Sequence, residues 1–118
     1  MWEVEYSDQF EVWWHDLADE RQDAVDAAVR MLEERGPSLG RPFVDTLQGS
    51  RHANMKELRP RGSNLRVLFA FDPRRTAILL LGGDKTGQWE EWYAVNIPWA
   101  DALYDEHLAT LRSEGEMR

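Results

Sequence analysis

The chain has 118 residues, and its 22 Asp and Glu outnumber its 14 Lys and Arg, giving a formal net charge of −8 at pH 7. A composition of 42% hydrophobic and 31% charged residues is typical of a folded globular domain and excludes a disordered chain. The sequence has no cysteine, which excludes disulfides, thiolate metal sites and cysteine nucleophiles. Its apolar runs are far shorter than the ~20 residues that span a bilayer. The N-terminus does not resemble a signal peptide, so we expect a cytoplasmic protein with no membrane partner.

The N-terminal third predicts a strand followed by a helical hairpin. Apolar and acidic residues alternate over residues 2–6, as in a half-buried strand. Ser7 can cap a helix that follows, and Asp19 is predicted to cap a second helix that Gly36-Pro37 ends. Two helices joined by so short a turn form a hairpin. The apolar face of the first helix consists of Phe10, Trp13, Trp14 and Leu17.

The middle of the chain predicts a loop and then a β-meander. Residues 37–53 contain Pro, Gly and Ser without a clear period and are interpreted as the loop. In the central strand, the alternation of side chains places Leu65 and Val67 on one face and Arg66 on the other. The predicted strands are residues 55–59, 65–71 and 76–81, with turns at residues 61–64 and 72–75.

The C-terminal third predicts a loop and a last helix. Gly82-Gly83 is interpreted as the end of the last long strand, which releases the chain into a loop that carries Lys85. Residues 88–95 are compatible with a further strand or with irregular structure. The helix is predicted to begin at Asn96 or Ile97, with a proline in its first turn.

The predicted fold is α+β, with elements in the order β-α-α-β-β-β-α. We expect the N-terminal helical hairpin to cover one face of an antiparallel sheet and to leave the other face open, with Arg66 pointing towards the open face. A single domain is expected over residues 1–112, followed by a frayed tail over residues 113–118.

Positive charge is concentrated in the predicted strands, although the chain as a whole is acidic. Residues 51–75 hold seven Lys or Arg against two acids, whereas residues 1–35 hold three Arg against eleven acids. A local cationic surface on an acidic protein favours a polyanionic substrate. The seven cations are Arg51, Lys56, Arg59, Arg61, Arg66, Arg74 and Arg75.

The order of elements and two segments together resemble the RelE/ParE toxin superfamily, in its HigB-like, phage-derived branch. The segments are MKELRP at residues 55–60 and LRVLFAFDPRRTAILLLGGDK at residues 65–85, and the resemblance covers residues 2–111. It implies a RelE-like fold and a toxin of a type II toxin–antitoxin pair that cleaves mRNA, often on the ribosome, without a cofactor. It also implies a cognate antitoxin, which in this branch is usually a helix-turn-helix DNA-binding protein. The implied RNA site consists of Lys56, Arg59, Arg66 and Lys85.

The chemistry of RNA cleavage suggests roles for these cations. The 2′-OH of RNA can attack its own phosphate without a metal if the enzyme helps to remove the proton, stabilises the extra charge on phosphorus and protonates the leaving 5′-oxygen. Arg66 is predicted to stabilise that charge, because its planar guanidinium holds phosphate oxygens and a strand holds it rigidly. Lys56 and Lys85 are predicted catalytic residues that orient phosphate or transfer a proton. The alternative is that Arg66 only pairs with Glu57 and that both lysines are solvated.

Two arginines and a histidine are predicted to contact RNA around this centre. Arg59 and Arg61 flank a proline beside the predicted turn and are expected to position phosphates. Arg61 could equally be only a charge on the turn. His52 is a candidate acid, base or RNA contact, because histidine titrates near neutrality, or else an idle loop residue. No set of His, Asp and Glu residues has metal-ligand spacing, so we expect no metal and no cofactor.

Three aromatic residues follow Lys85 within a short stretch. Tyr93 is predicted to bind RNA by stacking on a base, as aromatic side chains do in RNA sites. Trp89 and Trp92 offer the same chemistry, with packing in the core as the alternative for at least one of them.

Two other functions stay open on the sequence. A ParE-like toxin would poison gyrase by binding, with the same fold class and no need for catalytic residues. The second open function is that of a catalytically inactive interaction module with the same fold. It is favoured by the acidic composition and by Asp84 and Thr86, which flank Lys85 where the branch commonly has a second lysine.

Overall fold

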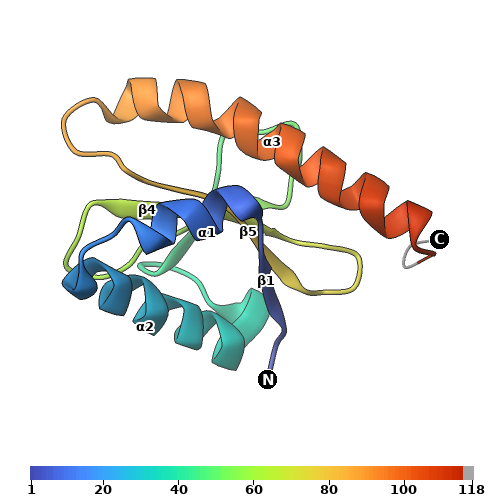
Figure 1. The fold of residues 1–118 in the computed structure, drawn as a ribbon, viewed down its shortest axis with the longest axis horizontal. Coiled ribbons are helices and arrows are strands. Elements are labelled where there is room, and N and C mark those ends of the chain that lie inside the picture. Colours follow the sequence, from blue (N-terminus) through green and yellow to red (C-terminus); the bar gives the residue numbers. More distant parts are fainter. Residues whose placement is uncertain (116–118) are drawn as a thin grey trace.

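The computed structural model describes residues 1–115 as a sheet with helices on both sides (Figure 1). The last part of the predicted tail, residues 116–118, lies outside the described residues. Within residues 1–115, no helix is long and apolar enough to cross a membrane. The elements are β1 (Val4–Tyr6), α1 (Asp8–His15), α2 (Asp19–Arg35), the 3-10 helix η1 (Gly36–Ser38), β2 (Val44–Thr46), β3 (Met55–Leu58), β4 (Leu65–Phe71), β5 (Ala77–Asp84) and α3 (Trp89–Ser113).

The strands form one sheet in the order β1-β5-β4-β3-β2. Neighbouring strands from β2 to β5 are antiparallel, which confirms the predicted α+β fold. β1 differs from the prediction because it pairs in parallel with β5, with Val4 opposite Ala77. β2 corrects the interpretation of residues 37–53 as a loop. Its three residues are too few to show a periodic pattern, and pairing with β3 is what makes them a strand.

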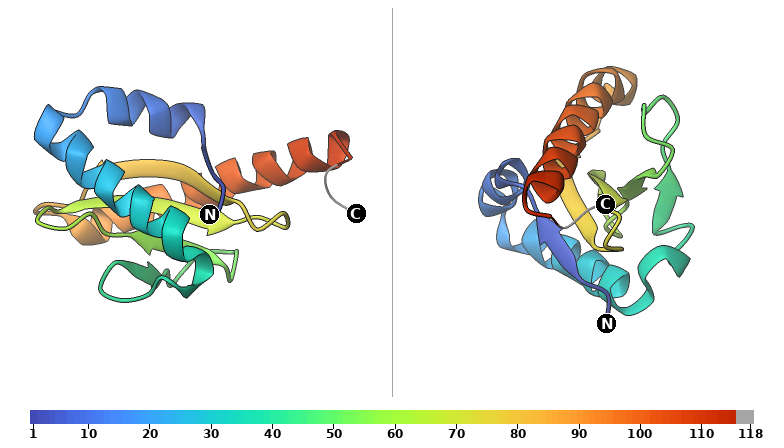
Figure 2. Two further views of the ribbon diagram at one scale, coloured as in Figure 1. Left: turned by 90° about the horizontal axis from the view of Figure 1, so that it is seen from below. Right: turned by 90° about the vertical axis from the view of Figure 1, so that its right-hand side faces the viewer.

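Both faces of the sheet are covered, so the expectation of an open face is wrong. Val67 and Phe69 of β4 pack with buried residues of α1 and α2 in one core. Leu68 and Ala70, which point the other way, pack with buried residues of α3 in a second core. Figures 1 and 2 show α3 along one side of the strands and α2 along the other. The sheet is therefore the middle of three layers.

α3 begins at Trp89, whereas the sequence pattern places its start at Asn96 or Ile97. Aromatic and β-branched residues in this segment favour a strand locally. Trp92 and Tyr93 nevertheless pack in the same core as the later residues of α3, and this tertiary contact outweighs the local preference. Pro98 consequently lies inside the helix, where it removes a backbone donor.

The N-terminal cap of α1 is as predicted, and that of α2 is not. The Ser7 hydroxyl accepts a hydrogen bond from the N–H of Phe10 at 3.0 Å and donates one to the carbonyl of Leu80 at 2.6 Å. Ser7 therefore both caps α1 and ties it to β5. The cap of α2 is Ala18, which makes no side-chain cap hydrogen bond, and Asp19 is the first helical residue.

Two glycines of β5 let tryptophans from both helical layers approach the strand backbone. A Cβ atom added at Gly82 would lie 2.2 Å from the Trp13 ring, and one added at Gly83 would lie 2.3 Å from the Trp92 ring. Gly82 and Gly83 are thus strand residues, not the start of the loop that the sequence indicates. Their lack of a side chain sets how closely α1 and α3 pack on the sheet.

A buried carboxylate joins α3 to the β4–β5 hairpin. Asp72 is 4% exposed and its carboxylate contacts His107 Nε2 of α3 at 2.8 Å and Arg74 Nε at 3.0 Å. Burial by itself raises the pKa of Asp72, but hydrogen bonds from His107, Arg74 and the N–H of Thr76 outweigh burial and hold the pKa below its ordinary value.

Replacing Gly83 by Ala should destabilise the fold by about 1–3 kcal/mol, because the new methyl group overlaps the Trp92 ring. Urea denaturation followed by tryptophan fluorescence measures the free energy of unfolding. Gly40→Ala is the matched control, since a Cβ atom at Gly40 meets nothing within 4 Å. Equal stabilities of the two variants would contradict the close packing of Trp92 on β5.

Asp72→Asn should cost about 1.5–3 kcal/mol of folding free energy at pH 7, because a buried charged acceptor is lost. The pKa of Asp72 is lowered in the folded state, so its stabilisation is present above the unfolded pKa and is lost as pH falls through the folded pKa. The difference between wild type and Asp72→Asn should therefore shrink below about pH 3.8. Asp23→Asn, which changes an exposed carboxylate on α2, is the control; a pH-independent difference for Asp72→Asn would contradict the linkage.

Candidate functional site

Five side chains from three strands and a helix meet at one end of the sheet, on the α3 side. Four of them surround the carboxylate of the fifth, Glu57, and we call all five the Glu57 cluster. β3 and the residue just after it contribute Glu57 and Arg59, β4 contributes Arg66, the residue after β5 is Lys85, and α3 contributes Tyr93. Three cations and one carboxylate give this cluster a net positive charge.

Glu57 is the centre of the cluster. It is 2% exposed, although it lies in a short strand near the edge of the sheet. Its Oε1 accepts a very short hydrogen bond from the hydroxyl of Tyr93, and its Oε2 accepts one from Arg59 Nε at 2.9 Å. A buried carboxylate is stable only when hydrogen bonds and opposite charges replace its hydration. Glu57 therefore fixes the positions of the groups that contact it.

Arg66 is held in place without using all of its donors. Its Nη1 donates to the carbonyl of Leu65 at 2.7 Å, while its Nε lies 3.8 Å from Glu57 Oε1, too far for a hydrogen bond. Among the described residues, Arg66 Nε is the buried side-chain nitrogen or oxygen atom that has no hydrogen-bond partner. Arg66 is thus ion-paired with Glu57, and its Nε makes no hydrogen bond.

Lys85 lies over two aromatic rings, one of which, Tyr93, is also part of the Glu57 cluster. Its Nζ is 5.9 Å from the ring centroids of both Trp89 and Tyr93. Partial burial lowers the pKa of Lys85, and the positive charge of Arg66 lowers it further. The ammonium is thus a stronger acid than an ordinary lysine and is close to another cation.

Tyr93 closes the cluster from α3. Burial raises the pKa of its phenol to about 12, and the hydrogen bond to Glu57 contributes to the same shift. The phenol therefore stays protonated and donates to Glu57 at neutral pH. The hydroxyl end of Tyr93 is engaged inside the protein, so any stacking on RNA would have to use the rest of its ring.

Lys56 lies on the face of the sheet opposite to Arg66. It pairs with Phe69 in the β3–β4 ladder, and Phe69 belongs to the core under α1 and α2. Its neighbour Glu57 pairs with Leu68, which belongs to the core under α3. Successive side chains of a strand point to opposite faces of the sheet, so Lys56 and Glu57 are on different faces.

Arg61 and His52 also lie apart from the Glu57 cluster. Arg61 is on the exposed β3–β4 turn, with its guanidinium carbon 5.5 Å from the ring centroid of Phe43. His52 Nε2 contacts Asp105 Oδ1 at 2.7 Å, and Asp105 is ~18 Å along α3 from Tyr93 at 1.5 Å per residue. The structure thus brings together Arg59, Arg66, Lys85 and Tyr93, and leaves Lys56, Arg61 and His52 outside.

The central role of Glu57 is the feature that the sequence interpretation missed, since it treated this residue only as a partner of Arg66. One signal was present. Glu57 is a lone acid among Lys56 and Arg59, and it shares a strand face with Arg59 by two-residue spacing. The contact with Tyr93 gave no such signal, because 36 residues separate the two in the chain.

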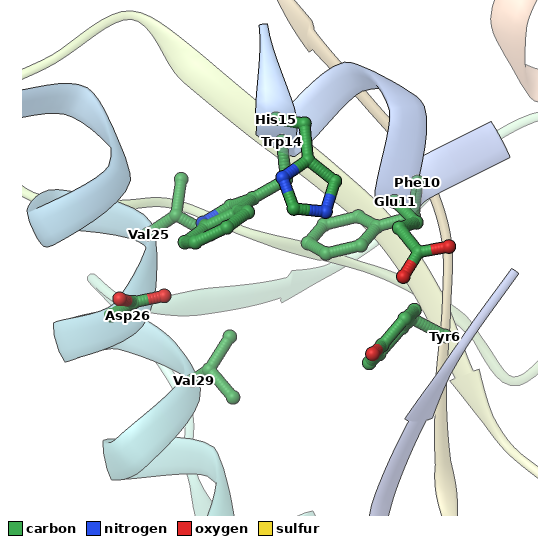
Figure 3. Close-up of a pocket in the computed structure, with 8 residues that line it drawn as sticks. All are labelled: Tyr6, Phe10, Glu11, Trp14, His15, Val25, Asp26 and Val29. Carbon is green, nitrogen blue, oxygen red and sulfur yellow. The ribbon is translucent and has the colours of Figure 1, made fainter. Parts of the chain in front are cut away.

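An apolar cavity of about 300 Å³ lies elsewhere, between α1, α2 and β1 (Figure 3). Phe10, Trp14 and Val25 line it, and the carboxylates of Glu11 and Asp26 are at its margin. Acidic groups repel RNA, so the Glu57 cluster is the better candidate for a site that binds a polyanion. Within residues 1–115, no three His, Cys, Asp or Glu side chains are grouped to hold a metal ion.

The fold resembles that of solved RelE-type toxins. The isolated RelE toxin of Escherichia coli superposes with a TM-score of 0.60 at 11% identity, over 80% of this chain and 97% of that one. The toxin–antitoxin complex RelBE2 of Mycobacterium tuberculosis gives a TM-score of 0.56 at 19% identity, over 70% of this chain and 96% of that one. At such low identity, the comparison defines a RelE-like fold and nothing more.

Sequence comparison places the chain within a family. Residues 12–105 match the family described as "Phage derived protein Gp49-like (DUF891)". Two relatives in Mycobacterium tuberculosis (strain ATCC 25618 / H37Rv), named as candidate toxins HigB2 and HigB3, are each 50% identical. The chain therefore belongs to this Gp49-like family, in the HigB-like branch of the RelE superfamily, and the predicted resemblance is confirmed.

The two relatives differ in how much of their length is matched. The match with HigB3 covers 91% of this chain and 94% of HigB3, whereas the match with HigB2 covers 86% of this chain and 52% of HigB2. The chain thus spans about half the length of HigB2 and nearly the whole of HigB3.

The contact between Tyr93 and Glu57 should appear as an energetic coupling. We expect Tyr93→Phe to cost about 1 kcal/mol and Glu57→Met about 3 kcal/mol, because the latter leaves buried cations without a counter-charge. The double variant should cost less than the sum by about 0.5–3 kcal/mol. Urea denaturation of wild type, the two single variants and the double variant measures the free energies of unfolding. The control pair is Tyr93→Phe with Glu91→Gln, which changes an exposed acid nearby, and its two losses of stability should be additive. Additive losses for Tyr93→Phe and Glu57→Met would exclude the contact in solution.

Proposed function

We propose that this protein is the toxin of a type II toxin–antitoxin pair and that it cleaves mRNA on the ribosome, in the cytoplasm, without a metal. Membership of the Gp49-like family supports the toxin role, because the relatives HigB2 and HigB3 are named as candidate toxins. The RelE-like fold supports it as well, since several structures with that fold are of toxins. Cleavage of RNA rests on the Glu57 cluster.

The observation that carries the proposal is that the Nε of Arg66, although ion-paired with Glu57 at 3.8 Å, has no hydrogen-bond partner. A buried donor without a partner costs folding free energy and calls for a ligand or a function. Arg66 has a side chain that is only 13% exposed and lies close to a second cation, Lys85, and to Arg59. A phosphate is the natural ligand for a planar guanidinium beside further positive charge.

The proposed reaction is an internal transfer within the RNA. The 2′-oxygen forms a bond to phosphorus, and the bond from phosphorus to the 5′-oxygen breaks. The proton of the 2′-OH passes to solvent water, and a second proton is delivered to the leaving 5′-oxygen, so the charge of the RNA does not change. Arg66 stabilises the additional negative charge on the phosphate oxygens. The products are a 2′,3′-cyclic phosphate and a 5′-hydroxyl end.

Lys85 is the proposed proton donor to the leaving oxygen. Its lowered pKa makes it a better acid than an ordinary lysine, and its position beside Arg66 brings it to the same phosphate. Arg59, which Glu57 orients, is assigned to an adjacent phosphate.

The roles of Lys56, Arg61 and His52 stay predictions, because each lies apart from Arg66 in the described structure. These three residues can contact a bound RNA only if the RNA extends around the edge of the sheet, away from the reaction centre. We therefore expect Ala substitutions at these three positions to weaken cleavage less than substitution of Arg66.

A cognate antitoxin is part of the proposal, and by the resemblance it is a helix-turn-helix DNA-binding protein. The RelE-like structure RelBE2 is that of a toxin–antitoxin complex. An acidic antitoxin segment would suit the positive Glu57 cluster by charge.

The double variant Arg66→Ala/Lys85→Ala should abolish growth arrest and RNA cleavage after induction in bacteria, because both groups that act on the phosphate are removed. Sequencing of RNA ends, separately for 5′-hydroxyl and 5′-phosphate ends, measures cleavage. We expect new 5′-hydroxyl ends with wild type and with the control Arg30→Ala, an exposed cation on α2, but not with the double variant.

Three outcomes would contradict the proposal in different ways. New 5′-phosphate ends would indicate hydrolysis by another mechanism. Growth arrest with intact mRNA and damaged DNA would indicate a gyrase-poisoning toxin. Cleavage that persists in a soluble, folded double variant would exclude Arg66 and Lys85 as the reaction centre.

A further inference from the structure

The apolar cavity between α1, α2 and β1 has no part in the Glu57 cluster (Figure 3). Its volume of about 300 Å³ is at the lower end of the range for sites that bind small molecules. Aromatic rings form much of its wall. Those of Tyr6 and Phe10 lie against each other, with centroids 6.0 Å apart and an interplanar angle of 45°. Trp14 extends this wall, and Val29 of α2 faces it across the cavity.

Two carboxylates lie on opposite sides of this cavity (Figure 3). Glu11 comes from α1 and is beside Tyr6, whereas Asp26 comes from α2 and is beside Val29. Within residues 1–115, neither carboxylate takes part in an ion pair. Two negative groups that the protein's own cations leave unneutralised, at the edge of an apolar cavity, favour a ligand with positive charge and an apolar body.

The charge of the whole helical hairpin adds to this preference. Residues 1–35 hold three Arg against eleven Asp and Glu. A surface with charge of one sign raises the local concentration of ions of the opposite sign. His15 also lines the cavity, and it carries a positive charge only when it is protonated. Binding of a cation is therefore best measured at pH 8.

We propose that this cavity binds an aliphatic diamine, which is a hydrocarbon stem with an ammonium group at each end. The stem displaces water from the aromatic and valine side chains, and the two ammonium groups meet Glu11 and Asp26. An ammonium near the ring of Trp14 or Tyr6 is also attracted to the face of that ring. A monoamine leaves one of the two carboxylates without a partner, and an uncharged ligand leaves both.

NMR titration of the ¹⁵N-labelled protein with 1,5-diaminopentane at pH 8 tests the proposal. The indole N–H signal of Trp14, assigned with a Trp14→Phe variant, should shift with a dissociation constant of about 0.1–1 mM. n-Pentylamine has the same stem with one charge and should bind about 3- to 10-fold more weakly. 1,5-Pentanediol has no charge and should bind more weakly still. Diamines of increasing stem length should show one best length, because both ends have to reach a carboxylate.

Variants distinguish the cavity from the acidic surface around it. Glu11→Gln and Asp26→Asn should each weaken binding of the diamine about 3- to 10-fold and remove most of its advantage over n-pentylamine. Val29→Phe places a larger side chain in the cavity and should prevent binding. Asp23→Asn changes an exposed carboxylate of α2 outside the cavity and should bind like wild type. Thermal melting of each variant checks that the fold is intact.

Three outcomes would overturn the proposal. Equal binding of all stem lengths, unaffected by Val29→Phe, would mean that amines associate only with the acidic surface. Binding of 1,5-pentanediol as tight as that of the diamine would mean that the cavity instead accepts an apolar side chain of a protein partner. A Trp14 signal that does not move at about 20 mM diamine would exclude this ligand class. None of these outcomes bears on RNA cleavage, because the cavity is on the α1–α2 side of the sheet and the Glu57 cluster is on the α3 side.

Discussion

Three cationic side chains share one end of the sheet, and the buried carboxylate of Glu57 allows them to lie so close together. Without it, Arg59 and Arg66 would repel each other in a region that is largely shielded from water. Glu57 compensates only part of this charge, because Lys85 is a third cation and the Nε of Arg66 makes no hydrogen bond to Glu57. The cluster is therefore stable enough to exist in the free protein and still has capacity for an anion.

The position of α3 depends on a second constraint, the glycine residues at the end of β5, which have no side chains. Gly83, which pairs with Arg66 in the β4–β5 ladder, admits the indole of Trp92 against the strand backbone. Further along α3, Asp72 holds His107, so the helix is fixed to the sheet near both ends. Because the helix is rigid, these two attachments determine where Tyr93 and Trp89 stand relative to the cations.

The cationic cluster lies apart from the acidic residues of α1 and α2. The acidic residues of α1 and α2 lie on one side of the sheet, together with an apolar cavity that has carboxylates at its margin. The cationic cluster lies at the end of the sheet on the α3 side. A polyanion is attracted to the cationic cluster and repelled by α1 and α2, so a protein with a net charge of −8 can still attract a polyanion at one place.

The sequence by itself determined the elements whose pattern is local. The helical hairpin, the β4 alternation and the cap at Ser7 all follow from residues close together in the chain, and the family follows from the segments around Glu57 and Lys85. The tertiary structure decided the rest. The start of α3, the pairing of β2 and the grouping of Arg66 with Tyr93 depend on contacts between distant residues, in which burial and hydrogen bonding outweigh local preference. The separation of Lys56 from Arg66 depends on strand pairing that sets which face each side chain occupies.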